Sequence, residues 1–595
     1  MLSTMIASLL HDRFVSYGTH CVPELGCYLG WVSDDDGGDV EPEVDETGRV
    51  LIFAGEDFSD NGAATRATKS NSGGDRWLRE LNGWFAGVLL DAAKKQIVLF
   101  NDRYGLHRVY YAQSRGMLTF ASEAKALLAS HPRTRQLNPT AMGEFVAYGT
   151  VLHDRTLFED VFVLPAGSAW TIESAAAIAK RRYFTPQEWE AQSPLTTDEF
   201  CDRLESTLST VVPRYFSGAR QVAVSLTGGV DTRLVMAFAD RARDVRSYTF
   251  SGMYRDCFDV RIARTVASAC GCNHETLRLD PEFLQHFPTY AEKTIWSTDG
   301  TLDVGAAHEV YLTARARRIA PVRLTGNYGS EILRGASTFK PLSWSARLFQ
   351  PDFVPHIQEA HRSFAGIVTG HQVSFAAFRE IPWHLGSRLH VGQSQLNMRS
   401  PYMDNDLVAL TYQAPLPVRQ TPELWDRLLL RRNRHLASIP TDRGRVAGAG
   451  PLANVPNRFY NYALFKAEWY HQTGMPHWLA PIDRRVSQAL RPLFFMGSHK
   501  IEHYRTWFRD ALFPYLDSIV RESKETPYIN AAVAADMLAA HREGRGNFVA
   551  DINRIITIGL IDRLLIRQIV DRIDRKRTIE FDSRLHSPRQ IAAVR

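Results

Sequence analysis

The sequence has little cysteine, and the positions of its few cysteines exclude several kinds of protein. Six cysteines occur among 595 residues, and none stands in a C-x-x-C pair or at the spacing of a disulfide framework. A disulfide-rich secreted scaffold is therefore excluded, and we expect a reducing, cytoplasmic compartment. The cysteines are Cys21, Cys27, Cys201, Cys257, Cys270 and Cys272.

Long apolar runs are also missing. The most apolar late segment, 555–570, is interrupted by Asp562, Arg563 and Arg567, which predicts a core helix rather than a membrane span. The segment 2–10 is apolar but lacks the basic start and the cleavage site of a signal peptide. We therefore expect neither a membrane partner nor a secreted protein.

A strong charge of one sign is absent as well. The formal net charge is +5 at pH 7, from 70 Lys and Arg against 65 Asp and Glu. This small excess does not imply nucleic acid, and the basic segment 576–595 lacks the interleaved aromatic residues of a nucleic-acid interface. We expect no nucleic-acid partner and a mobile tail at 576–595.

At 595 residues the chain exceeds what one hydrophobic core supports, so two to four domains are expected. Residues 1–190 contain short apolar runs separated by turn residues, which are typical of strands. Residues 451–575 carry aromatic and aliphatic residues at helical spacing, which predicts stripes that face a core. The clearest early strands are 51–53, 85–90 and 96–100, and the late helices are 458–469, 485–493, 501–512 and 550–573.

Between 195 and 450 strand-like and helix-like segments alternate, which predicts a parallel sheet with helices on both faces. Apolar runs end just before Thr227, Ser251 and Thr325. Ligands of such sheets bind beyond the carboxyl ends of the strands, so these three positions can converge on one crevice.

A turn of small residues, Thr227-Gly228-Gly229-Val230-Asp231-Thr232, joins a strand at 221–226 to a helix that starts near 230. The free N–H groups and the dipole of a helix start make such a turn an anion site. Asp231 suits an anion site only if a metal ion lies between them, so the turn predicts the pyrophosphate of ATP with Mg²⁺. An ordinary strand–turn–helix with a Gly-rich corner is the alternative.

This turn resembles the pyrophosphate loop, S-G-G-x-D-S, of the ATP pyrophosphatase superfamily, in its asparagine-synthetase branch. Two further groups of motifs carry the same resemblance. The segments 82–86, 101–105 and 120–127 are similar to the N-terminal-nucleophile glutaminase domain of asparagine synthetases, a sandwich of two antiparallel sheets with flanking helices. The segment 399–407 resembles the family's R-x-P-F-L-D-x-x-L, which implies a structural turn bordering the substrate pocket.

The catalytic parts of a glutaminase do not follow the family pattern. The family uses a cysteine at the mature N-terminus, whose own amine acts as the base, whereas this chain starts Met1-Leu2-Ser3. The family's Asn-Gly-Glu, whose Asn supports the oxyanion, is here Ala54-Gly55-Glu56. Cys27 partly resembles the family's opening C-G-I-x-G, but the sequence predicts a structural domain in which Cys27 is a small buried hydrophobe.

A second segment with candidate metal-binding and catalytic residues spans 322–335. The resemblance implies an acidic residue here that shares Mg²⁺ with the pyrophosphate-loop aspartate, and Glu331 is the candidate; a helix-capping contact is the alternative. Tyr328 to Ile332 is closer to the Tyr-Gly-Ser-Asp-Ile of β-lactam synthetase, where a tyrosine pairs with a downstream glutamate to deprotonate an amine. That implies a catalytic pair of Tyr328 and Glu380.

Two more residues complete the candidate site. Asp299 either binds a substrate amine or caps a helix, and Arg443 stands where the family places a lysine that neutralises the transferring phosphate. The residues expected to contact ATP are Ser225, Thr227, Gly228, Gly229, Asp231, Thr232, Ser251 and Gly326, and those expected to hold Mg²⁺ are Asp231 and Glu331.

The resemblance therefore implies an α/β protein with three parts: an amidotransferase-like α+β sandwich at 1–190, a doubly wound ATP-pyrophosphatase sheet at 195–450, and a helical extension at 451–575. It implies an AMP-forming carbon–nitrogen ligase that uses ATP and Mg²⁺ to join a small-molecule or peptide carboxylate to an amine or ammonia. The alternatives are a glutamine-hydrolysing asparagine synthetase and a non-catalytic scaffold relative. The oligomeric state stays open, with a homodimer among the options.

Overall fold

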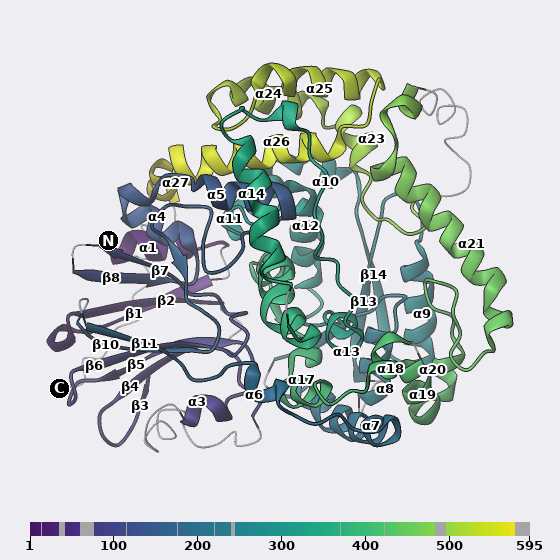
Figure 1. Cartoon of the computed structure of the whole chain (residues 1–595), viewed down its shortest axis with the longest axis horizontal. Coiled ribbons are helices and arrows are strands. Elements are labelled where there is room, and N and C mark those ends of the chain that lie inside the picture. Colours follow the sequence, from purple (N-terminus) through teal and green to yellow (C-terminus); the bar gives the residue numbers. More distant parts are fainter. Residues whose placement is uncertain are drawn as a thin grey trace.

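The structure is a computed structural model of the whole chain (Figure 1). It describes residues 1–12, 15–34, 42–59, 76–114, 116–174, 177–218, 220–239, 244–368, 370–421, 423–481 and 496–576. The expected helix at 485–493 and all of the expected tail beyond Lys576 lie outside the described residues.

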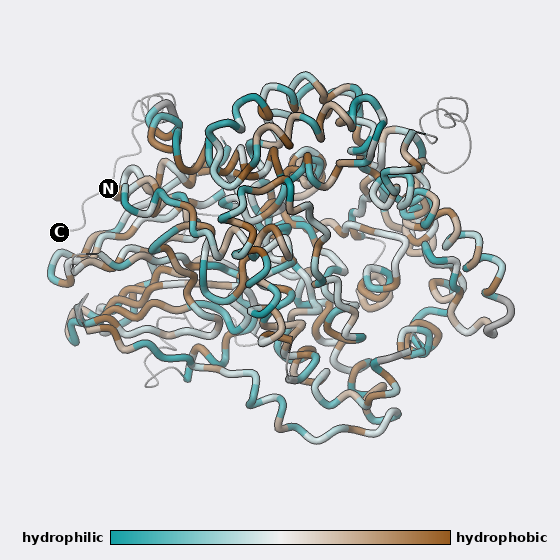
Figure 2. Tube along the Cα trace, turned by 45° about the horizontal axis from the view of Figure 1, so that its top comes forward, coloured by the Kyte–Doolittle hydropathy of each residue, from teal (hydrophilic) through white to brown (hydrophobic). Residues whose placement is uncertain are grey.

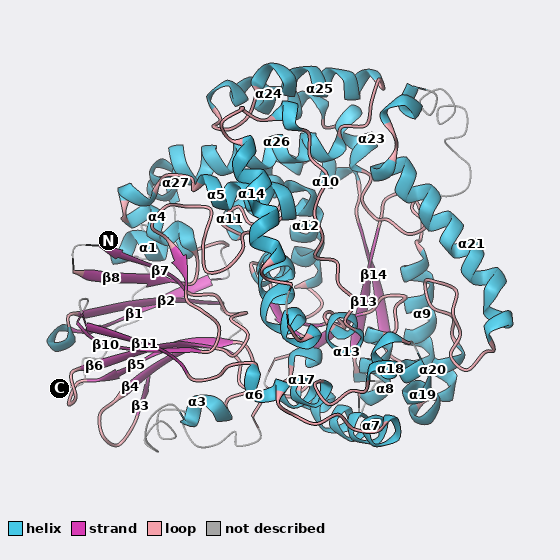
Figure 3. Ribbon diagram, in the orientation of Figure 1, coloured by secondary structure: helices cyan, strands magenta, loops and turns pink. Residues whose placement is uncertain are grey.

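The N-terminal part is built from antiparallel strands in layers, at the left of Figures 1 and 3. Its largest sheet has the order β11-β10-β6-β5-β4-β3, beside a smaller sheet β8-β7-β9 and the hairpin β1-β2. The expected strands are confirmed as β4 (Val50–Gly55), β5 (Phe85–Asp91) and β6 (Gln96–Asn101). The others are β1 (Val15–Val22), β2 (Cys27–Asp34), β3 (Glu43–Val44), β7 (Tyr110–Ser114), β8 (Met117–Ala121), β9 (Phe162–Val163), β10 (Ser168–Ser174) and β11 (Ala177–Arg182).

Alternating side chains of the largest sheet pack on two separate apolar clusters. One face, with Ile52 and Val88, joins Leu29 of β2 between the layers. The other face, with Phe53 and Phe85, is covered by Trp77 of α3 (Arg76–Glu80). The period of two along a strand sends neighbouring residues to opposite faces, so both faces are buried.

The second part contains a five-stranded parallel sheet of order β14-β13-β12-β15-β16. Its strands are β12 (Val222–Ser225), β13 (Arg246–Ser251), β14 (Asn273–Arg278), β15 (Val322–Leu324) and β16 (Asn397–Arg399). The chain order runs outward from β12 to β14 and then resumes at β15 on the other side of β12. This reversal makes the edge between β12 and β15 a topological switch point, the place where open α/β sheets bind ligands.

The predicted fold class is confirmed: N-terminal antiparallel layers, a parallel sheet with helices around it, and a helical C-terminal part (Figure 3). The late helices include α24 (Phe513–Glu522), α25 (Ala531–Glu543) and α26 (Val549–Ile561). Ile555 and Ile558 of α26 are buried in the same cluster as Leu127 of α4 (Ala124–Ser130). The late helices thus share a core with the N-terminal part.

Apolar residues lie mainly along the strands and inner helices, and polar residues cover much of the outside (Figure 2). No helix among the described residues is both long and apolar enough to cross a membrane. The segment expected as an apolar core helix is α26, continued by a π-helical turn at Asp562–Arg567.

One expectation about the C-terminal part is wrong. The aromatic residues of 458–469 lie in helix α21 (Pro451–Trp469), but Phe459, Tyr460 and Tyr462 are 73%, 60% and 56% exposed. Among the side chains of α21 that the structure describes, the buried ones are instead the polar residues Asn454, Asn461 and Glu468. Helical spacing groups these side chains correctly on the helix, but it does not determine which side faces the core.

Candidate functional site

Two turns meet at the switch point of the parallel sheet. The first links β12 to α8 (Asp231–Phe238), and the second links β15 to α13 (Gly329–Arg334). A Cβ atom on Gly326 would lie 2.5 Å from the backbone N of Thr232, and one on Gly329 would lie 2.9 Å from Cγ of Asp231. Only glycine permits this approach, so the two glycines bring the turns into direct contact.

Asp231, the first residue of α8, is the centre of the contact. Its Oδ2 accepts a 2.8 Å hydrogen bond from Oγ of Ser330, while its Oδ1 is buried without a hydrogen-bond partner among the described residues. Burial raises the pKa of the Asp231 carboxyl, against the opposing effects of Ser330 and of the Arg334 guanidinium. A buried acceptor that lacks a donor is costly in a folded protein, which points to a ligand at this atom.

Glu331 lies in the first turn of α13, where the negative charge of Asp231 acts on it. Burial, together with the charges of Asp231 and Glu380, raises the pKa of its carboxyl to about 7, while its own backbone N–H and Arg334 act in the opposite direction. Asp231 and Glu331 therefore lie within electrostatic reach of each other. The contact with its own N–H is of the capping kind, so the capping alternative and the metal-binding hypothesis both stay compatible with the geometry.

These two carboxylates fit a magnesium ion in part. Two half-buried, mutually repelling carboxylates, one with a buried and unpaired oxygen, suit a divalent cation, which prefers hard oxygen ligands. Within the described ranges no group of three or more His, Cys, Asp or Glu residues could hold a metal ion. The remaining ligands would have to come from water or phosphate oxygens, as is usual for Mg²⁺ held by one or two carboxylates.

The glycine turn itself is held by a residue that sequence reasoning missed. The Gly228 N–H donates a 2.6 Å hydrogen bond to Oδ1 of Asp259, in the first turn of α9 (Phe258–Cys270). Burial, with the charge of Asp442, raises the pKa of Asp259 to about 6. The signal was available, because α9 follows β13 and its first turn must lie at the same sheet edge as the glycine turn.

Of the hydroxyl residues of the expected ATP site, Ser225, Thr232 and Ser251 are buried, whereas Thr227 is exposed. Thr227 and Thr232 close the turn: their Oγ1 atoms are 3.2 Å apart, and the Gly229 N–H donates to Thr227 Oγ1 at 3.2 Å. Ser225 is 6% exposed at the end of β12. Ser251, fully buried at the end of β13, accepts a 3.2 Å hydrogen bond from Arg278.

Tyr328 and Glu380 have separate surroundings. Tyr328 takes the left-handed conformation (φ 74°) just before α13 and is buried with its ring edge against Trp84. Burial raises its pKa, and the strongest charge acting in the same direction is that of Glu331. Glu380, in the π-helix Ala376–Leu385, is buried and accepts hydrogen bonds from the N–H groups of Thr338 and Phe339. The structure thus brings Tyr328 to Glu331, and it places Glu380 on the backbone that follows α13.

Asp299 caps a helix from the N-terminal part. Its Oδ2 accepts from the N–H of Ala124 at 2.6 Å, and its Oδ1 accepts from the N–H of Lys125 at 3.1 Å. These are the first N–H groups of α4, whose own N-cap residue, Glu123, makes no side-chain cap. Of the two alternatives for Asp299, the observed contacts are those of helix capping.

Arg443 lies on a loop that reaches the glycine turn. The N–H of Asp442 donates to the carbonyl of Gly228 at 3.1 Å. The Arg443 side chain is 53% exposed, pairs with Asp442 at 3.3 Å and lies 4.1 Å from the centroid of the Phe465 ring. The neighbouring Arg445 is instead ion-paired with Asp426.

Arg233, to which the sequence analysis assigned no role, holds this loop in place. Arg233 of α8 is 1% exposed and donates hydrogen bonds to the carbonyls of Leu436, Ile439 and Pro440. It follows the glycine turn directly, so it ties the start of the loop at 441–449 to the same helix that carries Asp231. Local sequence gives no sign of a partner more than 200 residues away.

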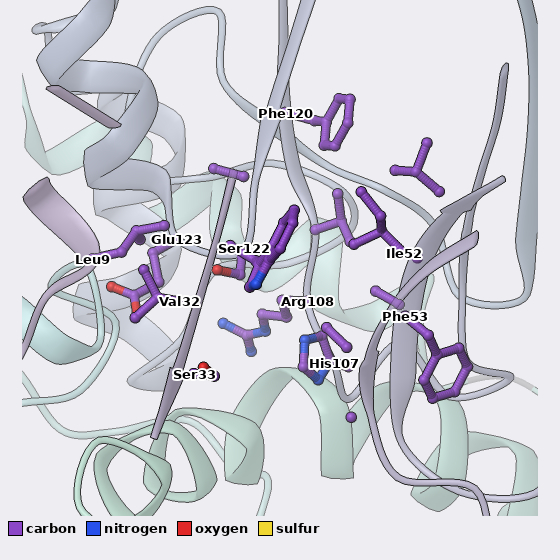
Figure 4. Close-up of a pocket in the computed structure, with 18 of the residues that line it drawn as sticks. Leu9, Val32, Ser33, Ile52, Phe53, His107, Arg108, Phe120, Ser122 and Glu123 are labelled. Carbon is purple, nitrogen blue, oxygen red and sulfur yellow. The ribbon is translucent and has the colours of Figure 1, made fainter. Parts of the chain in front are cut away.

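A separate, partly open cavity of about 1580 Å³ lies between the N-terminal part and the second part (Figure 4). It extends from between the strand layers to the end of β16; Leu9, Ile52, Phe120 and Glu123 line it, as does Arg399. Much of its lining is apolar, and Figure 4 shows the imidazole of His107 and the guanidinium of Arg108 as polar groups among these side chains.

Cys27 also lines this cavity, at the start of β2. It is buried, and burial raises the pKa of its thiol to about 11, so the thiol is protonated at neutral pH. Cys27 pairs with Val22 across the β1–β2 hairpin. Its nitrogen is thus part of a continuous backbone, and cutting there would detach strand β1 from the layer.

The motifs that resemble a glutaminase dock onto the parallel sheet. Glu56 forms a two-oxygen ion pair with Arg399 at the end of β16, with a shortest distance of 2.6 Å. Asn82 donates to Asp404 at 2.8 Å, and the Tyr104 hydroxyl donates to Asn405 at 2.9 Å. The segment 399–405 in turn contacts the switch point, because Tyr402 donates from its hydroxyl to the Asp231 carbonyl at 2.8 Å.

Comparison with known proteins gives two family matches. The glutamine amidotransferase domain model matches residues 64–184, and the asparagine synthase model matches residues 203–385. The second match contains both turns of the switch point, and the first contains the docking residues Asn82 and Tyr104.

Individual relatives match over part of their length. A putative glutamine-hydrolyzing asparagine synthetase of Mycobacterium tuberculosis is 27% identical over 283 residues, covering 45% of this chain and 42% of the relative. Glutamine-hydrolyzing asparagine synthetase 1 of Bacillus subtilis is 22% identical over 268 residues, covering 44% and 41%. The chain thus spans less than half the length of these curated relatives. A solved glutamine phosphoribosylpyrophosphate amidotransferase of B. subtilis matches with a TM-score of 0.23 at 9% identity, over 47% of this chain and 88% of that one.

Proposed function

Because the chain belongs to the asparagine synthetase family, we propose that it is an ATP-dependent amide synthetase that releases AMP and pyrophosphate. A carboxylate oxygen of the acid substrate attacks the α-phosphorus of ATP, and the bond between that phosphorus and the bridging oxygen breaks. An amine or ammonia then attacks the acyl carbon of the adenylate, loses a proton to a base, and expels AMP.

One observation carries this proposal: the pairing of Asp231, with its unpartnered Oδ1, and Glu331 at the switch point of the sheet. Both side chains lie at the start of a helix that follows a parallel strand, where N–H groups and helix dipoles favour phosphate. Asp231 and Glu331 would hold Mg²⁺, which when bound disperses negative charge on the departing pyrophosphate.

The surrounding residues supply positioning. Gly228 and Gly229 present backbone N–H groups to the phosphates, and a bound phosphate oxygen would compete with Asp259 for the Gly228 N–H. Arg443 lies beside this turn with its side chain about half exposed, so it is available to an anionic ligand. Tyr328 is close to Glu331, and its raised pKa keeps the phenol protonated at neutral pH. To take the amine proton, Tyr328 would have to pass its own phenolic proton to the Glu331 carboxylate in the same step.

ATP–pyrophosphate exchange tests this proposal directly. Purified protein with Mg²⁺ and labelled pyrophosphate is offered a panel of amino acids, dicarboxylic acids and peptides with a free carboxylate. We expect exchange that depends on one class of acid and on Mg²⁺. Release of phosphate instead of pyrophosphate, or the absence of acid-dependent exchange across the panel, would contradict an adenylating enzyme.

A second candidate function is a glutamine-hydrolysing asparagine synthetase, the activity named for the relatives. The N-terminal part argues against the hydrolysis, since the Cys27 thiol is protonated inside a hairpin and Ala54 lacks an oxyanion donor. We therefore expect ammonia or another amine to be the nitrogen donor. Measured glutamate release from glutamine, lost in Cys27→Ser, would favour this second candidate.

A further inference from the structure

Helix α21 buries polar side chains and exposes large apolar ones, the opposite of an ordinary amphipathic helix. Within 454–469, where its side chains are described, the buried residues are the polar Asn454, Asn461 and Glu468, which recur at intervals of seven residues, whereas Phe459 and Tyr462 are more than half exposed. Apolar surface left in water is unfavourable at roughly 25 cal/mol per Å². A helix that buries amides and exposes large rings therefore indicates a partner for its outer side.

The polar inner side is explained by two loops that it holds. Asn454 accepts from the Val446 N–H at 3.0 Å and donates to the Ala449 carbonyl at 3.2 Å. Glu468 accepts from the N–H groups of Gly497 and His499 at 2.6 and 2.8 Å and from the His503 ring at 3.1 Å. The inner face thus binds exposed backbone of the loops at 441–449 and 497–503, which leaves the rings on the outside.

The outer face of α21 is a row of residues at helical spacing that continues past its end: Val455, Phe459, Tyr462, Lys466 and Tyr470. The four apolar members are 50–73% exposed, and the Lys466 ammonium lies over the Tyr462 ring at 5.6 Å. Arg458 borders the row and is exposed. At a rise of 1.5 Å per residue the row is about 22 Å long.

We propose that this outer face of α21 docks an acidic peptide segment with apolar anchors, belonging to a peptide or protein that carries one of the substrates. Charge selects the occupant, because the exposed charges of α21 are positive and its one acidic residue, Glu468, is fully buried. A second copy of the chain would place Arg458 and Lys466 against their own copies across a twofold axis, which is repulsive. A free amino acid is too short to cover the row.

The location of α21 connects this surface to the nucleotide site. The loop that Asn454 holds carries Asp442, whose N–H bonds the carbonyl of Gly228. The loop that Glu468 holds contacts the start of α9, where the carbonyl of Ser498 accepts from the N–H of Phe258 at 2.7 Å. Helix α21 thus lies between a segment docked on its outer face and the loops that reach the glycine turn and the start of α9. The role of a docked segment in delivering a substrate rests on the proposed function, whereas the docking itself does not.

Peptide binding tests the inference without any catalytic readout. The probe is a fluorescein-labelled synthetic peptide of about 16 residues, matched to the row length, with Glu on one helical face and Leu and Phe on the other. We expect saturable anisotropy with a Kd on the order of 10 µM that weakens with salt. The double variant Phe459→Ser with Tyr462→Ser should weaken binding about tenfold, and Leu416→Ser, at an exposed leucine on another helix, should leave the Kd unchanged.

Three results would overturn the proposal. They are no saturable binding, equal binding of a peptide in which Lys replaces every Glu, and binding that the double variant leaves intact. A wild-type dimer that the double variant dissociates, seen by sedimentation, would assign the face to a second copy instead. Acid-dependent pyrophosphate exchange is measured on the same preparations. Exchange without peptide binding would contradict only the docking, and peptide binding without exchange would contradict only the proposed reaction.

Discussion

Asp231 combines burial, negative charge and an incomplete set of hydrogen bonds in one side chain. Its Oδ2 is bound by Ser330, and its Oδ1 is buried without a partner among the described residues. Such an atom destabilises the ligand-free protein and becomes favourable once a cation is present. The ionised form of the neighbouring Glu331 is likewise unfavourable in the ligand-free protein, as its raised pKa indicates. We therefore place the reactive centre of the molecule on these two residues.

Replacing Asp231 by asparagine should separate function from stability. Asp231→Asn keeps the shape and a hydrogen-bonding oxygen but removes the charge that Mg²⁺ needs, so exchange should fall by about 100-fold or more. The melting temperature should be unchanged or higher, because a buried charge is lost. Asp198→Asn is the control, since that carboxylate is 79% exposed. Exchange at the wild-type rate in Asp231→Asn would remove this residue from the mechanism.

Glu331 should make the stability of the ligand-free protein depend on pH. Its pKa is about 7 in the folded protein against an ordinary value of 4.5, so between these values the folded chain keeps a proton that the unfolded chain has released. Stability from this group is therefore present at pH 4.5 and is lost as the pH rises through 7. Glu331→Gln should match wild type at pH 5 and be more stable at pH 8, by on the order of 1 kcal/mol.

Thermal unfolding at pH 5 and pH 8 measures this difference. Glu188→Gln, at a half-exposed ion pair with Arg79, serves as the matched control and should leave the pH dependence as it is. A Glu331→Gln profile parallel to that of wild type would show that the carboxyl is already ionised at pH 5. The same ionisation predicts that exchange in wild type rises as the pH passes 7.

At the scale of elements, the site is a contact between two turns rather than one loop. The turn after β12 leads to Asp231, and the turn after β15 leads to Glu331. The backbones of these two turns can touch only because residue 326 is glycine. Parallel strands place their carboxyl ends at one edge, and the switch in strand order leaves space there for a ligand. The close approach at Gly326 is therefore a requirement of the fold as well as of the chemistry.

Adding one methyl group at Gly326 should separate the two turns. In Gly326→Ala the new Cβ would lie 2.5 Å from the Thr232 N and 2.8 Å from the Asp231 carbonyl carbon, both backbone atoms that cannot rotate away. We expect a loss of about 1–3 kcal/mol of unfolding free energy and at least tenfold slower exchange. Gly450→Ala, where a Cβ would meet nothing within 4 Å, should change neither. Normal exchange in Gly326→Ala would contradict the contact.

At the scale of the whole molecule, the N-terminal part behaves as a structural partner of the parallel sheet. Its family motifs make hydrogen bonds and ion pairs to the segment 399–405, and that segment bonds the backbone of Asp231. The Cys27 thiol, which is protonated at neutral pH and lies within a hairpin, is not placed to act as a nucleophile. We infer that this part supports the switch point, through contacts between residues that are more than 300 positions apart in the sequence.

The Glu56–Arg399 pair should be the strongest single link between these parts. Arg399 is 5% exposed, so Glu56→Ala leaves its charge buried without a carboxylate and should cost about 3 kcal/mol of unfolding free energy. Glu188→Ala breaks an exposed pair with Arg79 in the N-terminal part and should cost less than about 1 kcal/mol. Urea unfolding of both variants measures the difference. Equal losses would mean that the Glu56 pair is screened like a surface pair.

Local sequence was sufficient for β4, β5 and β6 of the N-terminal layers, for the glycine turn and for the class of the central sheet. These features follow from the period of apolar residues and from glycine at positions where other residues clash, and both are properties of neighbouring residues. The pairing of Tyr328 with Glu380 stays a prediction. The structure places Glu331 beside the tyrosine and Glu380 on the backbone of residues 338 and 339.

Tertiary structure alone decided the rest. Asp259 and Arg233 join the site through contacts with Gly228 and with the segment 436–440, and the outward direction of the α21 rings depends on two loops that need polar partners. The sequence determines which side chains share a face, because that is set by the local helix or strand geometry. Which face is buried depends on the free energy of contacts among residues hundreds of positions apart, and only the assembled chain brings those residues together.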